Sequence, residues 1–468
     1  MALIRLRAET SQIKTPGEIA QVQAISSWIK EKAITEVECL VPDISGIARG
    51  KILPPQKLLS SLEENGLRLP ESVFVQTVTG QYPEDETVTK ETNSDVYLRP
   101  DPVTLRLVPW YSEPTAQVIC DCVYVDEKPV DLAPREVLRK VVQLYDDRGW
   151  KPIVAPEVEF FLVSTNVDPD YPLKPPKGRS GRHETAPQSY GIDAVNEFDP
   201  LFEEVYDFCE AQDIDIDTLT HEAGAAQMEI NFNHGDPLSL ADQTFIFKRT
   251  VRQAAMRHKL YATFMAKPMM NEPGSAMHIH QSVVDKKTGK NLFALENGDN
   301  SPLFLSHIAG LQKYMPEACV LVAPNVNSFR RLRPDFDSPI NLQWGRDNRT
   351  AGLRVPVSGP ESRRLENRIP GADVNPYLAI AASLVCSYLG MVENLSPSEP
   401  VEETAYKFER TLPLDLVDAI NRFQASRKLP ELLGSRFCTV YAQVKQAEYE
   451  AYHRVISSWE REFLLLNV

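Results

Sequence analysis

The stretch Lys267–Ser282 reads Lys-Pro-Met-Met-Asn-Glu-Pro-Gly-Ser-Ala-Met-His-Ile-His-Gln-Ser, and it predicts a turn followed by a strand. The pair Pro273-Gly274 favours a turn in which the backbone passes close to another group. Beyond it, polar and apolar residues alternate with the period of a β-strand, so His278, His280 and Ser282 share one face. A lone histidine is more often structural, whereas two on one strand face directly after a glycine turn favour a ligand or phosphate site.

A second predicted strand, Ile153–Leu162, contains Glu157-Val158-Glu159. Alternation places the carboxylates of Glu157 and Glu159 on one face of this strand. Two like charges so close are unfavourable unless a cation or an arginine lies between them. The pattern therefore favours a metal site, with a solvated strand edge as the alternative.

These stretches resemble the class I glutamine synthetases. Lys267–Ser282 is similar, position by position, to the ATP-binding signature of that family. Further matches extend the resemblance over most of the chain, at Asp43, Glu157 to Glu159, Glu222 to Glu229, Arg331 and Arg349 to Arg368. The resemblance implies an α+β protein. We expect a small N-terminal β-grasp domain at residues 16–130 and a larger glutamine-synthetase-type catalytic domain, an antiparallel sheet with helices, at residues 131–468.

The resemblance also implies two divalent metal ions. One would be held by the residues Glu159, Glu222 and Glu229, and the other by Glu157, His278 and Glu366. Oxygen-rich ligand sets of this kind select Mg²⁺ or Mn²⁺ over zinc. Judged from the residues alone, Glu222 and Glu229 are equally compatible with two unrelated surface acids. Glu366 is likewise compatible with a simple ion pair to Arg368 on the same strand face.

Substrate roles follow from the same resemblance. Arg331 and Arg368 resemble the residues that hold the acceptor L-glutamate, with the Gly274 backbone beside its amino end. The residues that resemble ATP-binding positions are Arg349 and Arg354 at the transferred phosphate, and His280 and Ser282 on the nucleotide. The cluster of arginines independently favours phosphate or carboxylate guests, because each guanidinium needs solvent or an anion. The implied reaction is an ATP-dependent ligation of an amine to the glutamate γ-carboxylate through a γ-glutamyl phosphate.

Asp43 resembles an acid that reaches into the active site of a neighbouring subunit and helps to deprotonate the amine. Judged from the residues alone, its position beside Gly46 is more commonly that of an ordinary turn residue. The family match also implies a homo-oligomer, a ring-built dodecamer with active sites between subunits.

Some positions depart from the ammonia-using pattern. Asp337 stands where those enzymes carry a catalytic flap glutamate, Pro273 replaces an asparagine, and Ser72–Gln76 replaces an Asp-Gly-Ser-Ser turn. These departures are more similar to the γ-glutamylpolyamine synthetases, such as γ-glutamylputrescine synthetase, which act in polyamine catabolism. A diamine would suit the acidic runs Glu84-Asp85-Glu86 and Asp335–Asp337. An ammonia-using glutamine synthetase and a non-catalytic assembly protein of the same fold remain alternatives.

The composition is that of a soluble two-domain protein of 468 residues. The formal charge of −15 argues against nucleic acid or an anionic membrane as a partner. Seven scattered cysteines without a CxxC pair indicate reduced thiols and a cytoplasmic location, and Met1–Thr10 lacks the apolar core of a signal peptide. The apolar stretch Leu378–Val392 is too short to span a bilayer and predicts a buried helix.

We assign no chemical role to two segments of the sequence. Residues 164–200 form a polar, proline-containing stretch that predicts a long loop, in which Tyr190 is the one side chain placed to face substrate. Residues 242–259 predict an amphipathic helix with a basic face of Lys248, Arg249, Arg252 and Arg257, which we expect to be solvated or to contact another subunit.

Overall fold

The structure is a computed structural model that describes residues 16–64, 66–83, 93–185 and 187–468. The acidic run Glu84-Asp85-Glu86 and the segment Met1–Thr10, both considered above, lie outside the described residues.

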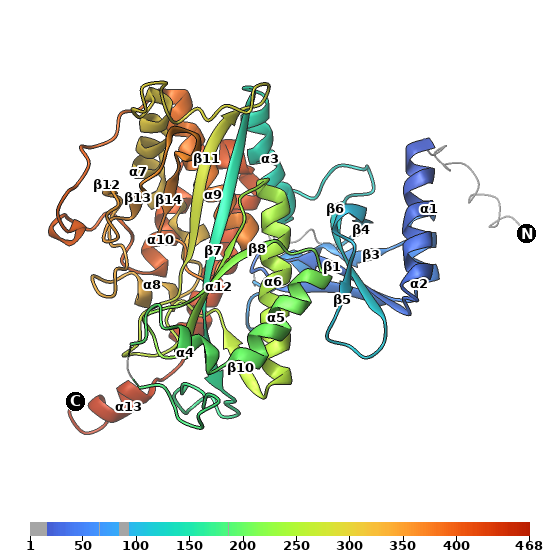
Figure 1. Cartoon of the computed structure of the whole chain (residues 1–468), viewed down its shortest axis with the longest axis horizontal. Coiled ribbons are helices and arrows are strands. Elements are labelled where there is room, and N and C mark those ends of the chain that lie inside the picture. Colours follow the sequence, from blue (N-terminus) through green and yellow to red (C-terminus); the bar gives the residue numbers. More distant parts are fainter. Residues whose placement is uncertain (1–15, 65, 84–92, 186) are drawn as a thin grey trace, which may run out of the picture.

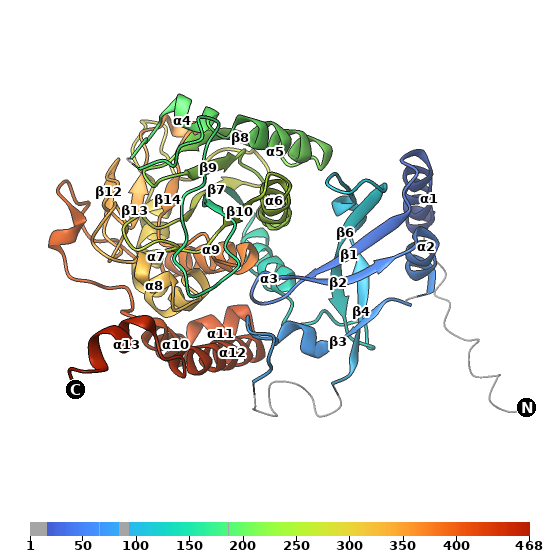
Figure 2. The ribbon, with the colours of Figure 1, turned by 90° about the horizontal axis from the view of Figure 1, so that it is seen from below.

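The first sheet has the strand order β2-β1-β6-β4-β3, and β5 pairs with β6. Its strands are β1 (Glu36–Pro42), β2 (Ala48–Leu53), β3 (Arg68–Pro70), β4 (Asp95–Pro100), β5 (Arg106–Val108) and β6 (Thr115–Val123). The central pair β1 and β6 is parallel, and the other pairs are antiparallel. Together with α1 (Pro16–Glu31) and α2 (Pro55–Glu64), this sheet lies to one side of a larger body (Figures 1 and 2).

The second sheet has the order β12-β13-β14-β11-β7-β9-β8, with β10 on β7. Its strands are β7 (Trp150–Ser164), β8 (Ile216–His221), β9 (Gln227–Phe232), β10 (Leu260–Thr263), β11 (Met277–Asp285), β12 (Trp344–Arg346), β13 (Leu353–Val355) and β14 (Leu365–Asn367). Every pair is antiparallel except β12 with β13. The long strands β7 and β11 lie at its centre (Figure 1), as expected from their alternating sequences.

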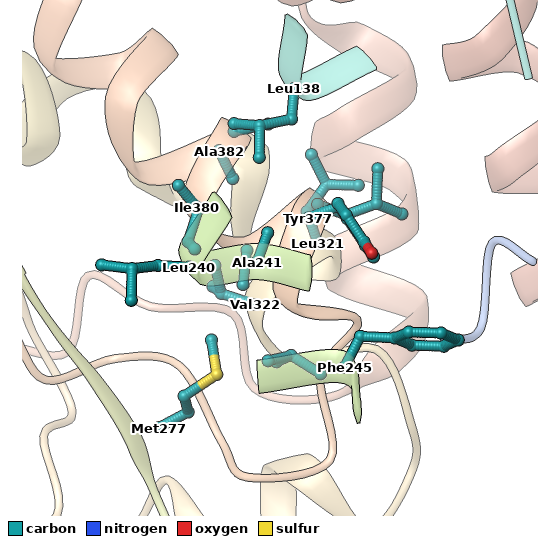
Figure 3. Close-up of a cluster of buried hydrophobic side chains, with 14 of the residues drawn as sticks. Leu138, Leu240, Ala241, Phe245, Met277, Leu321, Val322, Tyr377, Ile380 and Ala382 are labelled. Carbon is teal, nitrogen blue, oxygen red and sulfur yellow. The ribbon is translucent and has the colours of Figure 1, made fainter. Parts of the chain in front are cut away.

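Helices pack on this sheet and bury the core. They are α3 (Pro134–Asp146), α6 (Pro237–Arg257), α7 (Pro302–Val322) and α9 (Pro376–Glu393). Figure 3 shows buried side chains from these helices in one cluster that also includes Met277 of β11. Helices α7 and α9 approach so closely that a Cβ atom on Gly310 would lie 2.8 Å from the Cα atom of Gly390. Glycine at this crossing therefore permits the packing.

Helix α9 is long and apolar enough to cross a membrane by length and composition, but 89% of it is buried inside the structure. The prediction of a buried helix at Leu378–Val392 is thus confirmed. The remaining helices are α4 (Ile192–Asn196), α5 (Asp199–Ala211), α8 (Ser328–Arg331), α10 (Leu416–Ala425), α11 (Lys428–Leu433), α12 (Ser435–His453) and α13 (Ser458–Leu464). Short 3₁₀ turns occur at Glu71–Phe74, Pro102–Thr104, Pro360–Ser362 and Ala405–Lys407.

The expected α+β fold is confirmed, with a small β-grasp-type sheet and a larger, mainly antiparallel sheet covered by helices. The domain boundary between residues 130 and 131 stays a prediction. An ion pair crosses that boundary: Nη1 of Arg436 in α12 lies 2.8 Å from a carboxylate oxygen of Glu71, and the same atom lies 2.8 Å from Asp131 on its own side.

The structure corrects two predictions. The loop predicted at 164–200 ends at residue 191, because helix α4 (Ile192–Asn196) follows and α5 begins at Asp199. A five-residue helix is too short to leave a periodic apolar pattern. The basic face of α6 is not uniformly solvated, because Lys248 is only 7% exposed.

Candidate active site

A cavity of about 700 Å³ opens on the second sheet and collects most of the predicted site residues. The predicted residues that line it are Glu157, Glu159, Glu222, Glu229, Gly274, His278, Arg331, Asp337, Arg349, Arg354, Glu366 and Arg368. They come from parts of the chain that are more than 200 positions apart, so the fold and not local sequence brings them together.

The strand register positions the acidic and imidazole side chains. Strand β7 lies between β9 and β11, so that Glu157 is paired with His278 on one side and with Asn231 on the other. In the same ladder Glu159 pairs with Glu229. Because side chains on directly paired residues point to the same face of a sheet, these groups converge on one surface.

His278 and His280 both reach Glu157, as alternation along β11 predicts. Nδ1 of His278 lies 3.5 Å from Oε2 of Glu157 and 3.6 Å from Oε1 of Glu366. Nε2 of His280 lies 2.7 Å from Oε1 of Glu157. Two groups of residues have possible metal-ligand atoms that all lie within 4.8 Å of one another. One group is Glu157, Glu229 and His278, and the other is Glu157, His280 and Glu366.

These close groups are not the two trios inferred from the resemblance, which stay predictions. His280, assigned above to the nucleotide, belongs to the second group through its contact with Glu157. Among the described residues, Glu159 and Glu222 belong to neither group. Oxygen donors with one or two imidazoles nevertheless fit Mg²⁺ or Mn²⁺.

The carboxylates of the site have divergent pKa values. Burial, together with the nearby charge of Glu222, raises the pKa of Glu159 to about 8. Burial and the surrounding glutamates also raise the pKa of Glu229 well above its usual range. Burial acts in the same direction on Glu157, but hydrogen bonds from His278 and His280 hold its pKa below the usual range. Acids that repel one another in this way are stabilised by a bound cation.

The arginines differ in how they are held. Arg331 donates from its two Nη atoms to the backbone oxygens of Ile369 and Arg368, each at 2.9 Å. The carboxylate of Glu366 forms ion pairs with Arg368 at 2.5 Å and with Arg354 at 2.7 Å. The ion pair between Glu366 and Arg368 that the sequence allowed is therefore present. Arg349 lies exposed at the cavity, and in the described part of the chain no ion pair holds it.

Gly274 lies against Arg331. A Cβ atom at this position would come within 2.6 Å of both the Ala266 oxygen and Cγ of Arg331. The residue must therefore be glycine for the chain to pass here, as the Pro-Gly pair suggested. The Gly274 oxygen accepts a hydrogen bond from Nε2 of Gln227, which also lies 3.1 Å from Glu159. Gln227 was missed from sequence, because a neutral residue at the start of a strand carries no signal.

A neighbouring pocket of about 320 Å³ shares Glu157 and Asn231 with the cavity. It is lined by His280 and Ser282, which do not line the larger cavity. Nε of Arg364 donates to Nδ1 of His280 at 3.1 Å. Arg364, another residue missed from sequence, thus adds a positive charge to the pocket.

Asp43 lies apart from the cavity of its own chain. Its side chain is fully buried, and its oxygens accept hydrogen bonds from the backbone of Ser45 and Ile47 and from Nε of Arg49. Burial is the largest influence on its pKa, which is raised. Within one chain Asp43 therefore closes a turn, and its action in a neighbouring subunit stays a prediction.

The mouth of the cavity contains Tyr190, Phe336 and Asp337. Their φ angles of +60°, +48° and +57° lie in the left-handed region, which is unusual for non-glycine residues. The Tyr190 backbone donates to the oxygen of His221 at 2.9 Å. The end of the 165–191 loop is thereby attached beside Glu222, a placement that sequence could indicate only for Tyr190.

Residues 131–464 match the family model described as glutamine synthetase, catalytic domain. The chain is 35% identical over 461 residues to γ-glutamylputrescine synthetase PuuA of Escherichia coli, covering 96% of this chain and 95% of that one. It is 33% identical to the glutamine synthetase of Halobacterium salinarum, with 79% and 82% covered. It is also 31% identical to a glutamate–isopropylamine ligase of a Pseudomonas species, with 94% and 97% covered.

A solved structure has the same fold. Apo GmaS without ligand matches with a TM-score of 0.81 and 27% sequence identity, covering 94% of this chain and 99% of that chain. The similarity therefore includes both sheets and not the catalytic region alone.

Proposed function

The chain belongs to the glutamine synthetase family of ligases, and from this premise we propose that it joins the γ-carboxylate of L-glutamate to a polyamine such as putrescine, using ATP. The observation that carries the proposal is the joining of five glutamates, a histidine and four arginines in one cavity, next to a second pocket that holds His280 and Ser282. Acidic metal ligands beside arginines are typical of phosphoryl transfer.

The carboxylate and histidine cluster would hold Mg²⁺ or Mn²⁺, with Glu159, Glu222 and Glu229 in one set and Glu157, His278 and Glu366 in the other. Bound metal supplies charge neutralisation for the ATP phosphates. Glu366 is already held by Arg354 and Arg368, so its oxygens are fixed in place without any ligand. This preorganisation is what a phosphate site requires.

Substrate carboxylates would be bound by the buried arginines. Arg331 and Arg368 would hold L-glutamate, with the Gly274 backbone at its amino group. Arg331 donates hydrogen bonds to the backbone oxygens of Ile369 and Arg368, and these bonds hold its guanidinium group in a fixed orientation at the cavity wall. Arg349 and Arg354 would stabilise the phosphoryl group as it passes to the γ-carboxylate. The nucleotide would occupy the pocket with His280, Ser282 and Arg364.

The amine would enter at the mouth, between the exposed ring of Tyr190 and the carboxylate of Asp337. An aromatic face and a carboxylate together attract an ammonium group. Asp337 would receive the proton that the attacking nitrogen loses, because it is the mouth carboxylate not engaged by an arginine in the described ion pairs. The similarity to γ-glutamylputrescine synthetase and to glutamate–isopropylamine ligase supports an amine larger than ammonia.

Ammonia remains the second candidate, since the chain is also similar to glutamine synthetases. The test is phosphate release from ATP with L-glutamate and Mg²⁺, comparing ammonium, putrescine, spermidine, isopropylamine and ethanolamine at equal concentration. Preference for a diamine or polyamine supports the proposal. Preference for ammonium makes the chain a glutamine synthetase, and no activity with any amine favours the assembly protein.

We also propose a cytoplasmic homo-oligomer, a dodecamer, in which Asp43 serves the neighbouring site. Mixing two inactive variants tests this sharing. If Asp43→Ala and Arg349→Gln subunits are refolded together, mixed interfaces with both residues intact restore part of the activity. Co-refolding without any recovery would show that Asp43 does not act across subunits.

A further inference from the structure

A second cavity, of about 490 Å³, lies apart from the catalytic one. It is enclosed by the turn between β1 and β2, the middle of α6, the end of β10 and residues 372–374. None of the residues that line it also lines the catalytic cavity. Its chemistry is set by the basic residues of α6 that the sequence left without a role.

Lys248 is the most deeply buried of these cations. Its Nζ donates to the backbone oxygens of Ala372 and Val374, at 2.6 and 2.7 Å. An ammonium group has three N–H donors, so one is left over. In the described part of the chain no carboxylate forms an ion pair with it. Burial, with the like charge of Arg252, lowers the pKa of Lys248 to about 7.

Arg252 brings a second charge to the same place. Its guanidinium carbon lies 5.0 Å from the centroid of the Phe264 ring, and Nζ of Lys248 lies 5.6 Å from the same centroid. Two cations therefore flank one aromatic ring in the cavity wall. Across the described ranges, Arg252 forms no hydrogen bond or ion pair.

Other basic residues of the core are neutralised. Arg135 of α3 is bonded to Asp101, Asp121 and Asp242 at 2.6–2.8 Å. Arg249, which also lines the cavity, lies 2.5 Å from Glu38. Lys248 and Arg252 thus form no ion pair in the described part of the chain, although the Asp373 carboxylate in the same lining acts on Lys248 as a nearby opposite charge. Of the two, Lys248 is buried and Arg252 is exposed. A buried ammonium group without an ion-pair partner is costly, and a bound anion reduces that cost.

A hydroxyl group and a carboxylate complete the site. Ser45 also lines the cavity, and its buried Oγ has no hydrogen-bond partner among the described residues. Asp373 lines it too: Oδ2 accepts hydrogen bonds from Asn325 and Ser328, while no described residue donates to the buried Oδ1. A ligand that is anionic and carries a hydroxyl donor satisfies both kinds of group, and hydrogen phosphate has these properties.

We propose that this cavity binds a small oxyanion, a phosphate group or a carboxylate, between Lys248 and Arg252. The bound anion would accept hydrogen bonds from the third N–H of Lys248 and from the guanidinium N–H groups of Arg252. It would lie behind the wall of the catalytic cavity, because the Ala372 nitrogen donates to the oxygen of Ser275, next to Gly274. This site is independent of the proposed ligase activity.

Thermal unfolding of the full chain in inorganic phosphate, with sodium chloride holding ionic strength constant, tests the proposal. An anion that binds the folded state raises the Tm with its concentration. Because the catalytic arginines also attract phosphate, all measurements use an Arg349→Gln background. In that background, Arg252→Gln is expected to weaken phosphate binding, as measured from the rise in Tm, by about tenfold or more. The reason is the loss of a charge-assisted hydrogen bond.

Arg257→Gln is the matched control. It removes the same charge from the same helix, but Arg257 lies outside the cavity and pairs with Glu204. The proposal predicts that this control keeps the full phosphate response. Equal responses of the Arg252 and Arg257 variants would overturn it.

Selenate provides a second measurement that does not depend on a variant folding. Crystals soaked in selenate are expected to show anomalous density between Lys248 and Arg252, and its absence would contradict the proposal. Sedimentation distinguishes the binding of a free anion from a contact with a carboxylate side chain of a second copy of the chain. If phosphate has no effect and Arg252→Gln alters the oligomer, the counter-ion is a carboxylate of a second chain and the proposal is wrong.

Discussion

The carboxylate of Glu184 lies 3.1 Å from Nε2 of His221 and accepts a second hydrogen bond from the Ala226 nitrogen at 2.8 Å. Both contacts fasten the 165–191 loop to the turn that presents Glu222. His221 in turn has Nδ1 2.7 Å from the Glu222 oxygen, so the loop acid is connected to the backbone of a proposed metal ligand. Glu184 is therefore a positioning residue.

Replacing Glu184 with Ala should weaken metal binding. The turn at residues 221–226 would lose both tethers, and loss of such outer contacts typically costs tenfold or more in metal affinity. Mn²⁺ titration followed by electron paramagnetic resonance measures the affinity directly. Glu197→Ala is the control, because Glu197 accepts a hydrogen bond from Ser180 of the same loop and, among the described residues, forms none to residues 221–226. Unchanged Mn²⁺ affinity in the Glu184 variant would rule out this role.

The raised pKa of Glu159 predicts how the metal-free protein responds to pH. Its pKa of about 8 in the folded state exceeds the ordinary value of 4.5, so the folded state holds the proton more tightly than the unfolded state. This contribution to stability is complete below pH 4.5 and is lost as the pH rises through 8. Metal-free wild type should therefore lose stability between pH 6 and 8, and Mg²⁺ should restore it most at pH 8.

Glu159→Gln isolates that effect. Glutamine keeps an oxygen for the Ala276 nitrogen, which now donates to Glu159 at 2.8 Å, but it cannot ionise. Denaturant unfolding at several pH values should show a flatter profile for the variant than for wild type between pH 6 and 8. Identical profiles would show that Glu159 does not titrate there.

Sequence reasoning located the parts of the site that depend on strand periodicity. Alternation alone placed Glu157 with Glu159 and His278 with His280, and the β7–β11 register then joins the two pairs. It could not reveal that Glu184 contacts His221, because the two are 37 residues apart and a polar loop has no period.

For Lys248 the prediction from sequence is wrong rather than missing. Helical spacing groups it with Arg249, Arg252 and Arg257, and such a charged stripe normally faces solvent. Its burial is decided by Ala372 and Val374, more than 120 residues later in the chain, whose oxygens accept its hydrogen bonds. Long-range contacts of this kind leave no local signal in the sequence.

His307 should be a source of instability. Both ring nitrogens are buried and have no hydrogen-bond partner within the described ranges, and the ring centroid lies 4.7 Å from that of Phe293. An unsatisfied buried polar group costs about 1–3 kcal/mol, so His307→Leu should raise the free energy of unfolding by about that amount. Chemical denaturation at pH 7 measures it, with the exposed His453→Leu as control.

The same substitution should change the acid response. Burial lowers the pKa of His307 to about 3, below the ordinary 6.5. Between these values the unfolded state binds the proton and the folded state does not, so wild-type stability falls as the pH drops below 6.5. His307→Leu should remove this part of the fall. A destabilised variant with the wild-type acid profile would contradict both expectations.

Arg349→Gln should lower kcat strongly. Arg349 lines the cavity but is exposed and forms no ion pair with a described residue, so its loss should leave the fold intact. Removing one donor that stabilises transition-state charge typically costs about 10²–10³ in kcat. Steady-state assays with ATP, glutamate and the preferred amine measure it. Arg346→Gln, an exposed arginine outside the lining, should retain activity; similar losses in both variants would point to general charge rather than to Arg349.

Asp337→Asn should weaken the selection of the amine. The carboxylate at the cavity mouth attracts an ammonium group and accepts its proton, and an amide does neither. The expected result is a higher KM for putrescine together with a lower kcat, while the KM values for ATP and glutamate stay near wild type. Asp335→Asn is the matched control, since Asp335 is exposed two residues earlier and does not line the cavity. Because the left-handed φ of +57° at residue 337 is tolerated by asparagine, misfolding should not confuse the result. An increase confined to the glutamate KM would instead place Asp337 at the acceptor, and the amine would have to be recognised elsewhere in the cavity.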